Sequence, residues 1–381
     1  MIIGLVGKPS SGKSSFFKAS TLIDVKITGI PFCTIKPNIG IGYVIIDCVC
    51  KEFGLKCNPK TGYCKNGKRF IPVRLVDVAG LVPGAHEGRG LGNQFLDDLR
   101  QASALIHIVD VSGTRDAEGK ITSGYDPEND IIFLEKEIDM WFAAVIKKAA
   151  QKFGRTQKDV AQTVAEQLSG LEVTRKQVEQ TLEKVSLANT EAFATELRKI
   201  SKPILIAANK IDLKSAQENF EKLKQKYENM VPTSAESEIA LRKAAEKGLL
   251  EYIPGHDFTI SDSSKLVGPQ LEALDTIRRE VIEKYGSTGV QNCLNKAVFE
   301  LLDHIAVYPV EDENKLSDKN GNVLPDVHLV PRGTTALDLA FRIHTDIGSK
   351  FVSAIDVRTK RRLGKDYQLK NSDVIKIMTS K

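Results

Sequence analysis

A short segment near the N-terminus has the residue types and spacing of a phosphate-binding loop. Residues 7–14 read Gly-Lys-Pro-Ser-Ser-Gly-Lys-Ser and match G-x-x-x-x-G-K-[ST] at every position, between an apolar run and a helical pattern. The glycines of such a loop let backbone N–H groups turn towards a phosphate. We expect the Lys13 ammonium to bridge the β- and γ-phosphates and the Ser14 hydroxyl to bind Mg²⁺. The candidate nucleotide contacts are the loop residues Gly7, Lys8, Pro9, Ser10, Ser11, Gly12, Lys13, Ser14 and Ser15.

Two further segments could complete the contacts with the metal and the γ-phosphate. Asp77-Val-Ala-Gly80 follows the apolar run Phe70–Val76, so its carboxylate could reach Mg²⁺ through water and its glycine N–H could meet the γ-phosphate. Thr34 stands in a proline-bounded segment and could coordinate Mg²⁺ only when the γ-phosphate is present, which would make it a switch element. The alternative is a loop threonine that hydrogen-bonds its own backbone.

A third segment indicates which base is bound. Asn209-Lys-Ile-Asp212 follows the apolar run Pro203–Ala208. The Asp212 carboxylate can accept hydrogen bonds from N1–H and the 2-amino group of guanine, whereas adenine offers neither donor and would leave a buried charge unpaired. The stem of Lys210 could cover the base, and backbone N–H groups at Ser234 and Ala235 could meet guanine O6. In this order along the chain, the motifs predict a GTP-binding domain.

The residue that commonly orients the attacking water is missing. Leu81 follows the Asp77–Gly80 motif, and a leucine cannot orient water. His86, in a glycine-rich stretch, is the nearest candidate for that role, and the alternative is that it only packs or contacts a partner. Arg89 could supply positive charge. The predicted catalytic set is therefore Lys13, Thr34, Gly80 and His86, and unaided hydrolysis should be slow.

The elements that must position these residues are those of an α/β fold. Apolar runs of strand length alternate with helical patterns, as in a mostly parallel sheet. Residues 128–200 are instead rich in Lys, Glu, Gln and Ala, and Thr174-x-x-Gln177 is typical of a helix start. We therefore expect a helical insertion at 128–200 within a nucleotide-binding domain made of residues 1–127 and 201–303.

The C-terminal region has another pattern. Strand-like runs at Ile305–Val310, Asp326–Val330, Val352–Val357 and Val374–Met378 accompany one predicted helix from Thr335 to about Ile347. This composition predicts a small α+β domain of the β-grasp type over residues 304–381. The dense basic run Arg358–Arg362 could be a plain surface loop or could contact phosphates of RNA.

Four cysteines lie between the switch segment and the strand that leads to Asp77. Cys48, Cys50, Cys57 and Cys64 could close a tetrahedral Zn²⁺ site and stabilise a loop that has little core. Their spacing differs from the usual paired C-x₂₋₄-C pattern, so reduced thiols without metal and a disulfide stay as alternatives.

Length and composition restrict the class of protein. The chain has 381 residues, a net charge of +5 and 41% hydrophobic residues, which suits two domains with a sizeable core and neither requires nor excludes a nucleic-acid partner. The N-terminal apolar run is too short for a signal peptide, and no stretch of about 18 apolar residues indicates a membrane span. We expect a cytoplasmic monomer that does not bind membranes.

Several long segments resemble a known family. Residues 31–38 (PFCTIKPN) and 77–96 (DVAGLVPGAHEGRGLGNQFL) resemble the Obg-like GTPases, in the archaeal and fungal branch next to the YchF subfamily. Residues 329–346 (LVPRGTTALDLAFRIHTD) are similar to the TGS domain. The resemblance covers nearly the whole chain. It implies a P-loop sheet with a helical insertion, a ubiquitin-like TGS domain, and a role in translation with the ribosome or structured RNA as partner.

Two departures from relatives refine this expectation. ATP-preferring YchF relatives lack a proper guanine-reading aspartate, whereas Asp212 is present here, which favours GTP. Ser10 occupies the position of an asparagine found in many potassium-activated GTPases, which argues against activation by potassium. The leading interpretation is a GTP-hydrolysing switch that uses Mg²⁺. The alternatives are a nucleotide-gated RNA- or ribosome-binding adaptor with little hydrolysis, and an ATPase like the YchF relatives.

Overall fold

The computed structural model describes residues 1–21, 39–78, 100–150 and 159–380. The chain divides into two compact units. The N-terminal unit includes the described residues of 1–21, 39–42 and 74–297, and the C-terminal unit combines 43–73 with 298–380. Thr34, Gly80, Leu81, His86 and Arg89 lie outside the described residues.

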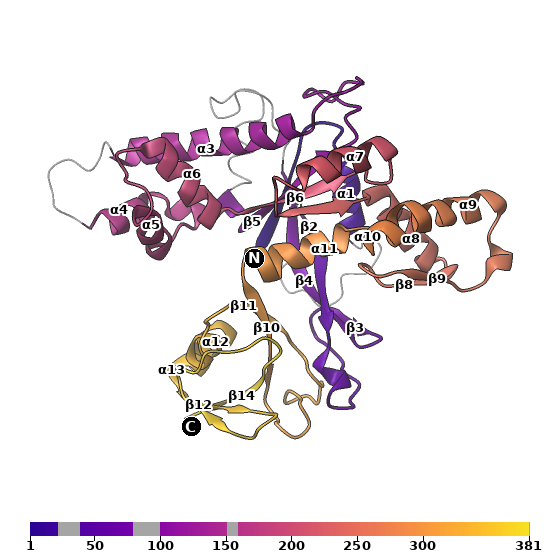
Figure 1. The fold of residues 1–381 in the computed structure, drawn as a ribbon. Coiled ribbons are helices and arrows are strands. Elements are labelled where there is room, and N and C mark those ends of the chain that lie inside the picture. The colour runs from indigo at the N-terminus through magenta and orange to yellow at the C-terminus, as the bar shows by residue number, and fades with distance from the viewer. Residues whose placement is uncertain (22–38, 79–99, 151–158, 381) are drawn as a thin grey trace. The chain divides into compact units, whose positions relative to one another are not determined.

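A mostly parallel sheet forms the centre of the N-terminal unit (Figure 1). Its strands follow the order β2-β4-β1-β5-β6-β7, and β1 pairs in parallel with both β4 and β5, as do β5 with β6 and β6 with β7. The strands are β1 (Ile2–Val6), β2 (Ile39–Asp47), β4 (Lys68–Asp77), β5 (Ala104–Asp110), β6 (Ile204–Asn209) and β7 (Met230–Thr233). All seven residues of β5 are buried, which explains the continuous apolar runs in the sequence. The predicted α/β class is confirmed.

Helices follow the strands of this unit. The phosphate-loop helix is α1 (Lys13–Ser20), and the later helices are α7 (Lys214–Leu223), α8 (Ala235–Glu246), α9 (Gly268–Ile277), α10 (Glu283–Tyr285) and α11 (Val290–Lys296). A hairpin of β8 (Leu250–Tyr252) and β9 (Phe258–Ile260), the 3₁₀ turn η4 (Ser263–Lys265) and the π-helical turn η5 (Arg278–Ile282) lie between α8 and α10. The sequence did not predict this hairpin.

Residues 128–201 form the expected helical region. It consists of α3 (Glu128–Ala150), α4 (Val160–Gln167), the 3₁₀ turn η3 (Ser169–Leu171), α5 (Arg175–Leu182) and α6 (Thr190–Ser201). Thr174 and Gln177 form the predicted reciprocal cap at the start of α5. Apolar side chains from these helices share one core, among them Trp141, Phe142, Val164, Val178 and Phe193.

The C-terminal unit contains a five-stranded sheet of order β11-β10-β14-β12-β13. Its elements are β10 (His304–Val310), β11 (His328–Pro331), α12 (Ala336–Ile343), α13 (Thr345–Ser349), β12 (Phe351–Asp356), β13 (Arg362–Leu363) and β14 (Val374–Thr379), preceded by the π-helical turn η6 (Ala297–Leu301). The single helix predicted from Thr335 to Ile347 is wrong in one detail. His344 is extended, and its ring accepts from the Asp346 N–H, so α12 ends and α13 begins there.

Residues 43–73 pack within the C-terminal unit. This segment contributes the 3₁₀ turn η1 (Val49–Lys51) and β3 (Tyr63–Lys65), which pairs with β4. The guanidinium of Arg69 is buried and donates to the backbone oxygens of Leu324 and Pro325, at 3.0 and 3.2 Å. The expected boundaries assign these residues to the nucleotide-binding domain, and the domain limits stay a prediction.

No helix within the described ranges combines the length and apolar character needed to cross a bilayer.

Candidate nucleotide-binding site

The phosphate-binding loop connects β1 to α1, as predicted. Gly12 caps the helix with a φ of 93°, and a Cβ there would lie 2.2 Å from Asn209 Nδ2. A Cβ on Gly7 would lie 2.6 Å from the Ile108 oxygen. Both positions therefore require glycine. No side chain caps α1, so its first backbone N–H groups stay available to a phosphate.

Lys13 and Asp77 meet at neighbouring strand ends. The register pairs Leu5 of β1 with Asp77 of β4, and the Lys13 ammonium forms an ion pair with the Asp77 carboxylate. Both side chains keep contact with solvent, at 15% and 24% exposure. Ser14 is exposed on the same turn, whereas the Ser15 hydroxyl donates to Glu236 at 2.6 Å. The structure thus brings together three of the residues predicted to bind phosphate and Mg²⁺.

The side chain of Lys8 is engaged elsewhere. It is buried, and its ammonium lies 2.8 Å from an Asp130 oxygen, donates to the Arg115 oxygen at 2.9 Å and sits 4.1 Å from the Tyr125 ring centroid. These contacts connect the phosphate-binding loop to the start of α3. Only the backbone N–H of Lys8 therefore stays a candidate phosphate contact.

Asn209 joins the two halves of the site. Its side-chain NH₂ group donates to the backbone oxygen of Ser11 at 3.0 Å, and its side-chain oxygen accepts from the Ala235 N–H at 3.2 Å. The side chain is buried. One side chain at the end of β6 thus holds the phosphate-binding loop and the loop after β7 together.

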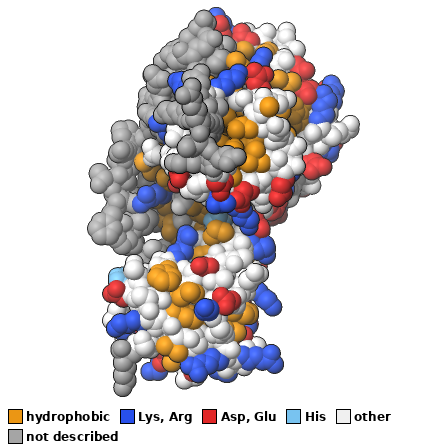
Figure 2. All heavy atoms as spheres, turned by 90° about the vertical axis from the view of Figure 1, so that its left-hand side faces the viewer, with side chains coloured by type: hydrophobic (Ala, Val, Ile, Leu, Met, Phe, Trp, Pro, Cys, Tyr) orange, Lys and Arg blue, Asp and Glu red, His pale blue; other side chains and the backbone are white. Residues whose placement is uncertain are grey.

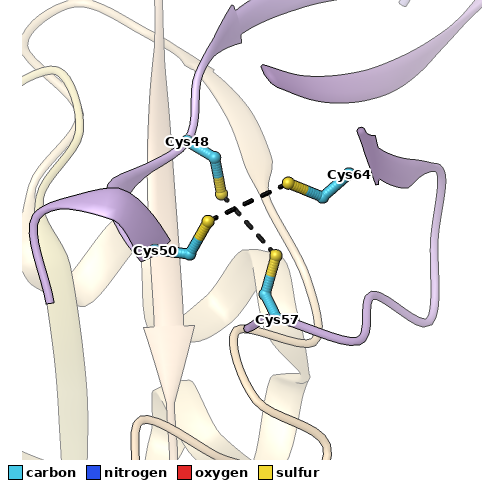
Figure 3. Close-up of side chains that lie close together, drawn as sticks. All are labelled: Cys48, Cys50, Cys57 and Cys64. Atoms are coloured by element: carbon cyan, nitrogen blue, oxygen red, sulfur yellow. Dashed lines mark hydrogen bonds between the residues drawn. The ribbon is translucent and has the colours of Figure 1, made fainter. Parts of the chain in front are cut away.

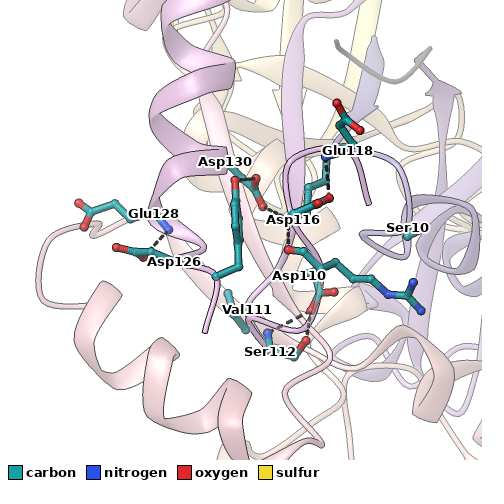
Figure 4. A network of polar contacts seen from close by, with 12 residues as sticks. Ser10, Asp110, Val111, Ser112, Asp116, Glu118, Asp126, Glu128 and Asp130 are labelled. Carbon is teal, nitrogen blue, oxygen red and sulfur yellow. Dashed lines mark hydrogen bonds and ion pairs between the residues drawn. The ribbon is translucent and has the colours of Figure 1, made fainter. Parts of the chain in front are cut away.

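Lys210 makes a second connection to the phosphate-binding loop. Its ammonium lies 2.6 Å from a carboxylate oxygen of Asp110 and donates to the backbone oxygen of Ser10 at 3.2 Å. Asp110 is buried at the end of β5 and also accepts from the Ser112 hydroxyl, in the network that Figure 4 shows. Sequence reasoning missed Asp110. Its signal was present, because Asp110 ends the run Ala104–Val109 as Asp77 and Asn209 end theirs.

Asp212 and Ser234 lie side by side on the base-recognition side. The Ser234 hydroxyl donates to Asp212 Oδ1 at 2.7 Å. The Ser234 N–H donates to the backbone oxygen of Thr288 at 2.9 Å, and the Ala235 N–H donates to the side-chain oxygen of Asn209. Both predicted donors to guanine O6 therefore have hydrogen-bond partners in this structure.

The buried carboxylate of Glu238 stabilises the loop that carries Ser234. Glu238 on α8 accepts from the Tyr252 hydroxyl at 2.5 Å and from the Thr288 hydroxyl, and pairs with Arg242 at 2.6 Å. Burial and the nearby Glu238 charge raise the pKa of Tyr252 well above its usual value. Glu238 thereby positions Thr288, which in turn holds Ser234. No local sequence signal marked the contacts of Glu238 with Tyr252 and Thr288, because these residues are 14 and 50 positions away and only Arg242 is nearby in the sequence.

The four clustered cysteines come together in the C-terminal unit (Figure 3). All four Sγ atoms lie within 4.8 Å of one another, and none forms a disulfide. Cys48 and Cys50 are buried and Cys57 and Cys64 are half-buried. Burial raises the pKa of the Cys48 and Cys64 thiols. This arrangement could hold a metal ion. Cys293 is fully buried outside the cluster, and Cys33 lies outside the described residues.

Much of the basic run is engaged inside the C-terminal unit. Arg358 makes two hydrogen bonds to the Glu52 carboxylate, at 2.6 and 2.8 Å, and the Lys360 ammonium donates to the backbone oxygen of Glu313 at 2.9 Å. Arg362 donates to Ser353 at 2.8 Å. On the face in Figure 2, Lys and Arg side chains lie among Asp and Glu side chains. The run is thus partly structural, which leaves fewer of its charges for RNA.

Three family models match parts of this chain. The model of the Obg-like GTPase YGR210-like, G4 motif-containing domain matches residues 207–312. The models of the 50S ribosome-binding GTPase and of the TGS domain match residues 2–144 and 319–379.

Similar proteins cover the chain more fully. The GTP-binding protein MJ1332 of Methanocaldococcus jannaschii is 50% identical over 100% of this chain and 99% of its own length. The ribosome-binding ATPase YchF of Bacillus subtilis is 31% identical over 70% of this chain and 75% of its own. The crystal structure of a GTP binding protein from Pyrococcus horikoshii OT3 is 41% identical, with a TM-score of 0.81 and complete coverage of both chains. The chain therefore belongs to the Obg-like GTPases, in the YGR210-like group related to YchF, and carries a C-terminal TGS domain.

Proposed function

We propose that this protein binds Mg²⁺-GTP and hydrolyses it to GDP and phosphate as a switch, and that it acts in the cytoplasm on ribosomes or structured RNA during translation. The observation that carries the proposal is that Asp77 and Asn209, at the ends of two strands of one sheet, contact Lys13 and the backbone of Ser11 in the phosphate-binding loop, with Asp212 three residues after Asn209. Ligands of open α/β sheets bind at the carboxyl ends of the strands, beside the strand where the order reverses, which is β1 here.

The described residues fit a Mg²⁺-nucleotide. The glycine turn and the uncapped α1 offer N–H donors to the β-phosphate, and the exposed Ser14 hydroxyl and the Asp77 carboxylate suit Mg²⁺. The ion, when bound, would neutralise charge on the phosphate oxygens. When nucleotide binds, the Lys13 ammonium would leave Asp77 and contact the β- and γ-phosphates. The Asp77 carboxylate would then be available to Mg²⁺.

Hydrolysis would depend on groups that approach the γ-phosphate. Thr34 and Gly80 would contact the γ-phosphate side, and His86 would accept a hydrogen bond from the attacking water in place of the glutamine that Leu81 replaces. Without a second charged group in place, turnover is expected to be slow. A chain that binds GTP tightly and scarcely hydrolyses it would instead be a nucleotide-gated adaptor.

The partner follows from the relatives and not from contacts in this chain. The matching family model is described as a 50S ribosome-binding GTPase, and the Bacillus subtilis relative as a ribosome-binding ATPase. The ATPase activity in the name of that relative makes an ATPase the second candidate. Asp212 distinguishes the two, because its half-buried carboxylate would gain two donors from guanine and none from adenine at those positions.

Calorimetric titration with Mg²⁺-GTP, Mg²⁺-GDP and Mg²⁺-ATP tests the base preference. We expect GTP to bind at least about 100-fold more tightly than ATP. Asp212→Asn should abolish that preference and favour xanthine nucleotides, whose C2 carbonyl accepts from an amide. Asp257→Asn, at an exposed position, is the matched control. Tighter binding of ATP by the native chain would reject the GTPase proposal.

Two further measurements test hydrolysis and the partner. His86→Ala should slow phosphate release from bound GTP at unchanged nucleotide affinity, and an unaltered rate would remove His86 from the mechanism. The full chain should sediment with ribosomes more strongly with a non-hydrolysable GTP analogue than with GDP. Equal sedimentation in both states would contradict a switch.

A further inference from the structure

We propose that Cys48, Cys50, Cys57 and Cys64 bind a single Zn²⁺ ion, and that this ion fixes the segment on which the loop 316–326 of the C-terminal unit is docked. The four side chains are the largest cluster of metal-ligating groups found among the described residues.

The sulfur positions match one four-coordinate ion. Zn–S bonds are about 2.3 Å long, so the sulfurs of a regular tetrahedral site are about 3.8 Å apart. The Sγ atoms of Cys48 and Cys57 are 3.8 Å apart, and those of Cys50 and Cys64 are 3.9 Å apart. In Figure 3 these two lines cross, as opposite edges of a tetrahedron do.

The same distances disfavour the other states that four cysteines can adopt. A disulfide requires its sulfurs about 2.05 Å apart, so each pair would have to close by nearly half. A cluster of several irons places iron and sulfide between the thiolates and needs a wider cage. Four unligated thiols have no reason to converge from separate elements, because each is only a weak hydrogen-bond donor.

Three elements converge to present the ligands. Cys48 follows the end of β2, and its N–H donates to the Gly67 oxygen at 2.8 Å. Cys50 lies in the turn η1, and Cys64 lies in β3 beside β4. Cys57 comes from residues 55–62, which form no helix or strand and include only one large aliphatic side chain, Leu55. Such a segment cannot fix itself by apolar burial, and a cross-link at Cys57 supplies the missing constraint.

The residues between Cys57 and Cys64 hold the loop of the C-terminal unit. Asn58 exchanges two hydrogen bonds with Val323, its N–H donating at 3.1 Å and its side-chain oxygen accepting at 2.5 Å. The Lys60 N–H donates to the Pro325 oxygen at 2.9 Å, and the Thr61 hydroxyl donates to Asp326 at 2.6 Å.

The two buried cysteines belong to an apolar core cluster of the C-terminal unit. Cys48 and Cys50 pack in one apolar cluster with Tyr308, Leu316 and Val374. The metal would thus connect the apolar cluster, against which Cys57 and Cys64 also pack, to the polar contacts that residues 58–61 make with the loop 316–326. Loss of the ion should loosen residues 316–326 first.

The test begins with the full-length protein, purified without chelator and measured for zinc and iron by mass spectrometry. We expect about one zinc per chain, and a Co²⁺-exchanged sample should show the visible bands of tetrahedral thiolate ligation. Zinc well below stoichiometry with four alkylatable thiols, a disulfide within the cluster, or stoichiometric iron would each overturn the proposal.

Variants separate the cluster from cysteines in general. Cys57→Ser should lose the zinc and lower the thermal midpoint by at least about 5 °C, whereas Cys293→Ser, at a buried cysteine of the N-terminal unit, should keep one zinc. GDP affinity should stay the same in Cys57→Ser.

A measurement on the native chain covers the case in which the variant does not fold. Hydrogen exchange is followed after zinc is removed with a chelator and again after zinc alone is restored. Exchange at residues 58–61 and 316–326 should rise at least about tenfold without zinc and return with it. If hydrogen exchange in these segments is the same with and without zinc, the docking role is refuted.

Discussion

Replacing Lys8 with methionine should destabilise the N-terminal unit while leaving its affinity for guanine nucleotides almost unchanged. The Lys8 ammonium is buried between the Asp130 carboxylate, the backbone oxygen of Arg115 and the Tyr125 ring. It is therefore not expected to contact a bound phosphate. Methionine keeps the length and the apolar stem and removes only the charge and its donors.

The size of the effect follows from the burial of both partners. The side chains of Lys8 and Asp130 are each 5% exposed, and removal of one member of a buried ion pair typically costs about 3–5 kcal/mol because the other charge stays buried. The Tyr125 hydroxyl still donates to Asp130 at 2.8 Å, which places the expected loss at about 3 kcal/mol. Lys8→Met combined with Asp130→Asn should recover at least half of it.

The pH dependence provides a second readout. Burial raises the pKa of Asp130, although Lys8 and Tyr125 act to lower it. Removing Lys8 should raise that pKa further. A carboxyl group whose pKa is raised on folding favours the fold below its unfolded pKa, and that advantage is lost as pH rises through the folded value. The deficit of Lys8→Met should therefore be largest at neutral pH and shrink towards acid pH.

Urea unfolding followed by the fluorescence of Trp141, the single tryptophan, measures the stability. Lys18→Met, at an exposed position of α1, is the matched control and should change the unfolding free energy by less than about 0.5 kcal/mol. GDP affinity is measured on the folded variants. A Lys8→Met protein with native stability and GDP binding weakened by about 100-fold or more would show that the ammonium contacts phosphate, and would refute this reasoning.

Two other predictions concern the N-terminal unit. Asn209→Ala leaves the Ser11 oxygen and the Ala235 N–H without their partner and should weaken GDP binding by about 30- to 1,000-fold, at about 2–4 kcal/mol for two buried groups; calorimetry showing a change below threefold would contradict it. Burial lowers the pKa of His107 to about 3, so its contribution to stability is complete above its unfolded pKa near 6.5 and is lost as pH falls towards 3. Between pH 7 and 5 the native chain should lose about 2 kcal/mol more unfolding free energy than His107→Phe, and the exposed His256→Phe should behave like the native chain in urea titrations.

The arrangement of the candidate nucleotide site was largely predictable because it is encoded locally. Each polar residue follows an apolar run, and parallel strands bring such residues to one edge of the sheet. Lys13 was located by the motif of residues 7–14, whereas this rule located Asp77 and Asn209, and applied evenly it would also have found Asp110. It describes where a residue lies along a strand and says nothing of which partner its side chain chooses.

What the sequence did not reveal depends on contacts between distant residues. Lys8 lies in a motif that predicts phosphate binding, but its partner Asp130 is in a different element. The cysteines predicted a metal site as one of three alternatives, because spacing alone cannot give sulfur–sulfur distances. Likewise, nothing local indicated that residues 43–73 would join the C-terminal unit through Arg69 and Tyr308.

The recognition of the base and the recognition of the phosphates are mechanically linked in this fold. Asn209 holds both loops, and Lys210, the next residue, fixes the phosphate-binding loop to Asp110. The Ser234 hydroxyl donates to Asp212 Oδ1, and the carboxylate keeps acceptor positions on both oxygens for further donors. Guanine therefore adds donors to a carboxylate that is in place, whereas adenine would bury the same charge with only Ser234 as partner. If Asp212 reads the base as proposed, a mismatched base should also weaken phosphate binding, because Asn209 and Lys210 stand on the same strand end as Asp212 and contact the phosphate-binding loop.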